Sequence, residues 1–186
     1  MRITNTADKG LKPLVPELSH RLYPALVGLL LGLLQTGLFF QLTFTLSSTI
    51  ATFLLVTLCW LLGSAVGVSY LAKTRWPTSA FLALALLAYA VCVVMLHAAP
   101  FNTRWWVFYA ALVAISGFYP GVFFGRMASV YTARTLFLRE NNGFIAGLVL
   151  GSLLFMLVGR MALWVTPALV AALVYWMGEP MDRQQG

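Results

Sequence analysis

A few amide side chains are the residues of this sequence most able to bind a solute. Gln35 and Gln41 lie in a long apolar run near the N-terminus, and Asn141 and Asn142 open a later one. Uncharged amides can hold a neutral solute, although in helix bundles they more often bond to a neighbouring helix. If there is a pocket, we expect Gln35 and Gln41 in its polar wall, reached from outside. Six residues of helix turn these two side chains about 120° apart, so they cannot point the same way.

No pattern typical of an enzyme or a metal centre accompanies these amides. Cys59 and Cys92 lie inside apolar runs, where free cysteine usually behaves as a small buried apolar residue. His20 precedes the first apolar run and His97 ends the third, so the two are too far apart to ligate one haem iron. No nucleophile–base pair and no phosphate-binding loop is found. We therefore expect no catalytic residue, no cofactor and no metal.

The composition is that of an integral membrane protein. Of the 186 residues, 61% are hydrophobic and only 9% are charged, and the mean hydropathy is +0.87. Soluble domains are about half apolar and about a quarter charged. The apolar surface is therefore expected to face lipid, with no room for a separate catalytic domain. The net charge of +7 is expected to reflect orientation in the membrane, not binding to nucleic acid.

Six apolar runs are each long enough, or nearly so, to cross about 30 Å of hydrocarbon as a helix. They lie at about 23–45, 50–72, 78–98, 105–125, 142–158 and 161–177. The predicted fold is an all-α transmembrane domain of six helices over residues 23–177. Residues 1–22 and 178–186 are expected to form cytoplasmic tails. The first tail lacks the pattern of a signal peptide.

Basic residues are distributed unequally between the two ends of these spans. With the N-terminus inside, only Arg104 and Arg160 lie outside, and ten basic residues lie inside. Because cytoplasmic loops are enriched in Lys and Arg, this asymmetry predicts that both termini are cytoplasmic. The ten are Arg2, Lys9, Lys12, Arg21, Lys73, Arg75, Arg126, Arg134, Arg139 and Arg183.

The segment 127–141 has two open interpretations. It mixes Tyr131 and Phe137 with Arg134 and Arg139, so it can be an amphipathic helix on the cytoplasmic surface or an ordinary basic loop. With Arg126 it would form a basic cytoplasmic surface, able to contact lipid headgroups or an acidic partner.

Glycines follow a regular spacing on four of the predicted helices. Ten of the 15 glycines repeat at four-residue steps, which places each row on one face of its helix. We expect these rows to pack the bundle internally, and any row left over to dock a partner or a second copy. The rows are Gly28 and Gly32; Gly63 and Gly67; Gly117, Gly121 and Gly125; and Gly143, Gly147 and Gly151.

Acidic residues are absent from the apolar centre of every predicted span. Ion-coupled carriers usually place an ionisable group there. This absence argues against proton or cation coupling within the chain, while a neutral solute can still pass.

Three stretches resemble a known family. SSTIATFLLVTLCWLLGSAVGVSYLAKTR, Ser47 to Arg75, resembles the second helix of the membrane domain attached to many bacterial spermidine-synthase-like proteins, a domain similar to half of a major-facilitator transporter. GFYPGVFFGRM, Gly117 to Met127, is similar to its fourth helix, and ENNGFIAGLVLGSLLF, Glu140 to Phe155, resembles its fifth. The resemblance implies a module of the bacterial inner membrane.

The chain departs from this family in three ways. Gln35 and Gln41 occupy the neighbourhood where the family often carries an acidic residue and an arginine. The turn Lys73-Thr74-Arg75 lacks the aspartate of the major-facilitator loop motif, and the sequence contains no aminopropyl-transferase domain. The resemblance therefore implies no chemistry.

Three functions remain open. The first is a non-catalytic membrane subunit that docks on another protein through glycine faces and the basic surface. The second is a small-solute transporter acting as a homodimer of six-helix halves. The third is a quinone-site or enzyme-associated membrane subunit using Gln, Tyr and Arg side chains.

Overall fold

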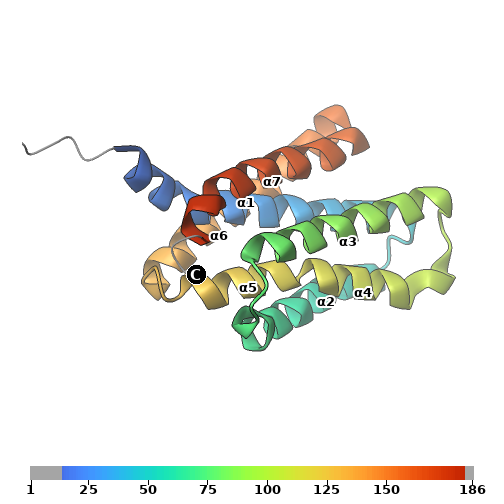
Figure 1. Cartoon of the computed structure of the whole chain (residues 1–186). Coiled ribbons are helices and arrows are strands. Elements are labelled where there is room, and N and C mark those ends of the chain that lie inside the picture. The colour runs from blue at the N-terminus through green and yellow to red at the C-terminus, as the bar shows by residue number, and fades with distance from the viewer. Residues whose placement is uncertain (1–13, 183–186) are drawn as a thin grey trace, which may run out of the picture.

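Seven α-helices and two short 3₁₀ turns make up the part of this protein that the structure, a computed structural model, describes (Figure 1). That part is residues 14–182, with side chains described over residues 22–178, and it contains no strand. The helices are α1 (Leu14–Thr45), α2 (Ile50–Ser69), α3 (Thr78–Ala98), α4 (Trp106–Ser116), α5 (Phe118–Met127), α6 (Ala133–Val158) and α7 (Arg160–Asp182). The turns are η1 (Leu71–Lys73) and η2 (Thr103–Trp105).

Six helical segments of the described residues are long and apolar enough to cross a membrane. They are Leu22–Thr45, Ile50–Lys73, Thr78–Ala98, Thr103–Met127, Ala133–Val158 and Arg160–Gly178, with α4 and α5 together making the fourth. Five of the six begin and end within a few residues of the ranges read from the sequence. Of the predicted tails, residues 1–13 and 183–186 lie outside the described part, as does the side chain of His20.

Helix α1 lies at the centre of the bundle. Figure 1 shows it between α7 on one side and α3 on the other. In its apolar stretch 67% of the residues are buried, against 17% for α6 and 28% for α2. The core around α1 is built from leucines on several faces, because a helix surrounded by other helices must be apolar all round. Leu30, Leu31, Leu33 and Leu34, which lie on different faces of α1, are each at most 2% exposed.

The fourth apolar segment is broken into two helices. Helix α4 ends at Ser116 and α5 begins at Phe118, on either side of Gly117. Pro120 has no N–H to complete the backbone bond one turn earlier, so the regular pattern is interrupted just before it. The Ser64 hydroxyl lies 3.1 Å from the Gly117 carbonyl oxygen and 3.0 Å from that of Trp60, and can donate to either.

The fifth apolar segment begins nine residues earlier than the sequence predicted. Residues 133–141 are neither a separate surface helix nor a loop, because they form the first turns of α6. The Thr132 side chain caps the helix by accepting a hydrogen bond from the Thr135 N–H at 3.4 Å. At its other end α6 stops at Gly159, which has φ 81°, and α7 starts at the next residue.

Candidate functional site

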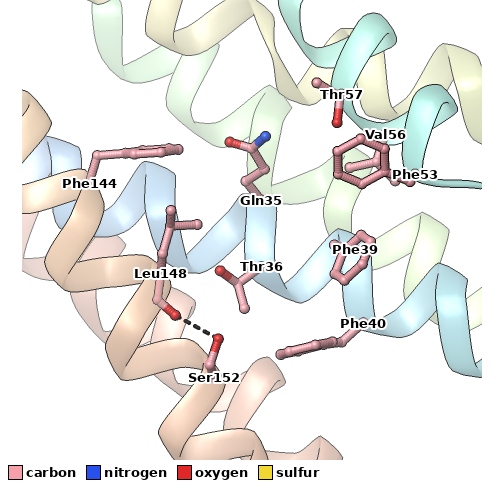
Figure 2. A pocket seen from close by; sticks show the side chains of 10 residues that line it. All are labelled: Gln35, Thr36, Phe39, Phe40, Phe53, Val56, Thr57, Phe144, Leu148 and Ser152. Carbon is pink, nitrogen blue, oxygen red and sulfur yellow. Dashed lines mark hydrogen bonds between the residues drawn. The ribbon is translucent and has the colours of Figure 1, made fainter.

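A cavity of about 340 Å³ lies between α1, α2 and α6 (Figure 2). Each helix contributes a row of side chains spaced so that they share one face. Four residues come from α1, three from α2 and three from α6. They are Gln35, Thr36, Phe39 and Phe40; Phe53, Val56 and Thr57; and Phe144, Leu148 and Ser152.

The position of this cavity follows from two close helix pairs. In the first pair, α1 packs on α6 so tightly that a Cβ atom added at Gly28 would overlap the Glu140 carbonyl oxygen. A Cβ at Gly147 would lie 3.0 Å from the Gly32 Cα. Glycine permits such backbone contact where any side chain would prevent it. The cavity-lining residues of α6 are each one position beyond its glycines, and so they lie at the edge of this contact.

In the second pair, α2 packs on α4 and α5. A Cβ added at Gly63 would overlap the Ala114 carbonyl oxygen, and one at Gly121 would lie 2.8 Å from the Gly67 Cα. The lining residues of α2 lie at least six positions before Gly63, toward the start of the helix. The cavity therefore occupies the space between two tightly joined pairs of helices.

Polar groups of the cavity come from all three helices. Figure 2 shows the Gln35 side chain projecting between Phe144 on one side and Phe53 and Thr57 on the other. The Thr36 residue is only 5% exposed, and no hydrogen-bond partner for its hydroxyl is found in the structure. The Ser152 hydroxyl donates to the Leu148 carbonyl oxygen at 2.8 Å. Gln35 and Thr57 therefore keep hydrogen-bonding capacity available to a ligand, whereas the Thr36 oxygen is buried in the packing.

Aromatic rings form most of the remaining wall. The rings of Phe39 and Phe53 meet edge to face, with centroids 6.1 Å apart and an angle of 89° between their planes. Phe40 stacks on Phe155 with a centroid distance of 4.7 Å, which fixes its orientation. Phe144 lines the cavity from α6. These rings give the cavity flat apolar surfaces.

The other predicted pocket residues lie elsewhere. Gln41 is 1% exposed and does not line the cavity, and neither its amide nitrogen nor its oxygen has a hydrogen-bond partner in the structure. Asn141 is half-buried and Asn142 is exposed, both on α6 before Phe144, and neither lines the cavity. The structure thus brings Gln35 together with threonines, a serine and phenylalanines, and not with Gln41.

Buried polar groups without a partner also occur away from the cavity. Besides Gln41 they include the hydroxyl groups of Thr45, Tyr109 and Ser116, which are distributed over α1 and α4. Such groups are costly to bury. They give no convergent set of donors and acceptors comparable with the cavity between α1, α2 and α6.

Cysteine and histidine are placed as packing residues. Cys92 is fully buried, Cys59 is half-buried, and both are free thiols. His97 bonds through Nδ1 to the Val93 carbonyl oxygen at 2.9 Å and meets the Trp164 ring edge to face. Among the residues that the structure describes, no group of three metal-ligating side chains is found.

The three arginines of the predicted basic surface differ in their surroundings. Arg126 donates to the carbonyl oxygens of Ala72 and Thr74 and to the Thr78 hydroxyl, at distances of 3.3, 2.9 and 3.1 Å. It therefore fastens the end of α5 to the turn between α2 and α3. Arg134 is exposed at the start of α6, and Arg139 is half-buried.

Glu140 belongs by sequence to the predicted cytoplasmic segment 127–141, outside any predicted span. In the structure it lies on α6, is 7% exposed and has neither an ion pair nor a hydrogen bond among the described side chains. The apolar run predicts a start at 142, whereas α6 begins at Ala133, because its first turns are polar. Thr132, a residue type common at helix starts, was the available signal.

Comparisons of this chain with known proteins give no match. No protein-family model, no curated protein and no solved structure is similar to it at a significant level.

Proposed function

We propose that this protein is a multi-pass protein of the cell membrane that binds a small uncharged solute in the cavity between α1, α2 and α6. The observation that carries the proposal is the convergence of two side chains with hydrogen-bonding capacity, Gln35 from α1 and Thr57 from α2, in one apolar cavity. Ligand sites are typically apolar cavities with a few polar groups that fix orientation.

Both termini are cytoplasmic in this proposal. Ten of the 12 Lys and Arg residues then fall inside, in agreement with the positive-inside rule. The orientation can be tested by replacing Ser129 or Thr103, both exposed, with cysteine and labelling intact cells with a membrane-impermeable maleimide. We expect Thr103→Cys to be labelled without permeabilisation and Ser129→Cys only after it. The reverse result would invert the proposed orientation.

A transport role is the form of this function that we favour. The chain would act as one half of a carrier, as the resemblance to half of a major-facilitator transporter implies, with a second copy supplying the other half. The proposal is tested by purification in mild detergent and native mass spectrometry of the intact protein. We expect a retained small molecule in the wild type and its loss in Gln35→Leu, with flux of that molecule in proteoliposomes.

A docking subunit is the second candidate. It is favoured by the large exposed surface of α6 opposite α1, where Ile145, Val149 and Leu153 are each about half exposed. The glycine rows no longer support it, because all four rows face another helix of the same chain. Replacing Gly121 or Gly147 would therefore break the bundle before it broke a complex. Co-purification should instead be compared between wild type and Val149→Ala, with loss of a partner as the expected result for a docking subunit.

A further inference from the structure

We propose that the ligand of this cavity is a planar uncharged ring bearing a carbonyl group, of the chemical class of quinones and aromatic ketones. This inference rests on the proposed function and names the kind of molecule that the site selects. It follows from the charge, the shape and the hydrogen-bonding groups of the ten lining residues.

The charge of the cavity excludes ions. None of the ten lining residues is ionisable in the pH range of a cell. Glu140, the nearest acidic residue along α6, comes four residues before Phe144 and does not line the cavity. An ion in an apolar cavity without a counter-charge costs far more than a neutral molecule of the same size. The occupant is therefore neutral.

The shape of the cavity favours a flat molecule. Phe39 and Phe53 form a right-angled corner, Phe39 and Phe40 are inclined at 49°, and Phe144 lies on the third helix. Aromatic rings attract another ring by offset stacking or by edge-to-face contact at centroid distances of about 4.5–7 Å. A volume of about 340 Å³ accommodates a single ring system, since it is at the small end of ligand cavities.

The hydrogen-bonding groups favour an acceptor on that ring. The Gln35 amide has two N–H donors, and the Thr57 hydroxyl has one. Gln35 lines the cavity from α1 and Thr57 lines it from α2, so a ligand between them can accept from either. A ring carbonyl supplies such an acceptor without adding charge.

The cavity also has a route for a ligand that is dissolved in the bilayer. Phe53 is 51% exposed while it lines the cavity, so the α2 wall extends to the lipid-facing surface. A hydrophobic tail attached to the ring can leave the cavity past Phe53 and remain in lipid. Lipid-soluble rings therefore fit this site better than water-soluble ones.

The test uses the purified full-length protein in nanodiscs and decylubiquinone as the probe. Decylbenzene, which has the tail and a ring but no carbonyl, is the matched ligand control. We expect saturable binding of decylubiquinone by equilibrium dialysis and at least a tenfold weaker affinity for decylbenzene. Equal affinity for the two compounds would overturn the carbonyl as the recognised group.

Three variants locate the binding. Gln35→Leu and Thr57→Val should each weaken the affinity for decylubiquinone about tenfold or more, because each removes a donor and keeps the side-chain volume close to the original. Gln41→Leu is the matched control, since Gln41 is a buried glutamine on the same helix that does not line the cavity. It should leave the affinity within about twofold of wild type. A thermal melt of each variant verifies that it is folded, and equal weakening in Gln41→Leu would overturn the assigned site.

The outcome also separates this inference from the proposed function. If decylubiquinone does not bind, but native mass spectrometry finds another small molecule that Gln35→Leu loses, the cavity is a ligand site and the ring class is wrong. If no molecule is retained and Gln35→Leu changes nothing, both proposals fail.

Discussion

The two glycine-packed helix pairs of this protein achieve the same close approach by different means. In the pair of α1 and α6, both helices are unbroken along the contact, and glycines on each side face the backbone of the other. In the pair of α2 with α4 and α5, one partner is broken at Gly117, and a side chain, Ser64, can donate to the carbonyl oxygen at the break. The glycine contact of the first pair is backbone against backbone, whereas the second pair adds a side-chain hydrogen bond to such a contact.

Because of this difference, we expect the two helix pairs to be sensitive to different kinds of substitution. A pair joined by backbone contact should tolerate no added volume, because no flexible side chain is available to move. A pair that also uses hydrogen bonds should lose stability when a donor is removed, even if its volume is unchanged.

The largest effect is expected for Gly143→Ala in the first pair. The new Cβ would overlap the Ala25 carbonyl oxygen, a backbone atom that can move only with its helix. We expect a loss of about 3 kcal/mol in stability, the upper end of the usual cost of overpacking. The melting temperature is measured by size-exclusion chromatography of samples heated to increasing temperatures. Ala146→Val, at an exposed alanine of the same helix, is the control. A melt of Gly143→Ala equal to that of the control would contradict the close contact.

A smaller loss is expected for Arg126→Met in the second pair. The variant keeps the length of the side chain and removes three hydrogen bonds to the turn between α2 and α3. Because Arg126 is only half-buried, we expect a loss of about 2 kcal/mol, near the value for one bond to a charged group. Arg134→Met, at an exposed arginine, should leave the thermal melt unchanged. If both variants melt alike, Arg126 does not stabilise the pair.

A still smaller loss is expected for Ser64→Ala. It removes the hydroxyl near the Gly117 carbonyl oxygen without adding volume. Hydrogen bonds between membrane helices contribute about 0.6 kcal/mol on average, and we expect a loss of that size. Ser69→Ala, at an exposed serine of the same helix, is the control in the same melt. An effect as large as that of Gly143→Ala would remove the contrast between the two pairs.

The smallest effect, and the only gain, is expected for Glu140→Gln in the first pair. The Glu140 carboxylate is buried and has no ion pair among the described side chains, and a carboxylate in such surroundings costs more than an amide of the same shape. We expect a rise of about 0.5 kcal/mol in stability at neutral pH, measured by the same melt. A clear fall in the stability of Glu140→Gln would contradict this prediction, because it would mean that the charged carboxylate stabilises the fold.

Hydropathy predicts the spans of this protein, but glycine spacing does not predict which helices pack against each other. The length and apolar content of the runs predict six spans, and the described residues contain six helical segments long and apolar enough to cross a membrane. Four glycine rows can combine into pairs in three ways, and no local property of Gly28 or Gly63 selects among them. The start of α6 was missed because residues 133–141 are too polar to be recognised by hydropathy, although Thr132 is a helix-capping residue type.

The cavity could be predicted only in part. Gln35 stands out in the sequence as an amide in an apolar run, and it lines the cavity. Phe53 and Phe144 do not stand out, since the chain has 13 phenylalanines and most membrane helices carry several. Which of them face Gln35 depends on how two helix pairs lie against each other, and this is a property of the assembled bundle.

The single glycine that joins α6 to α7 has a consequence for how the chain enters the membrane. Since only Gly159 separates the two helices, there is no loop that could be translocated separately from them. In the proposed membrane orientation, α6 and α7 would therefore insert together as a helical hairpin. In the proposed orientation this hairpin tip would also give proteases and antibodies outside the cell almost no peptide to recognise.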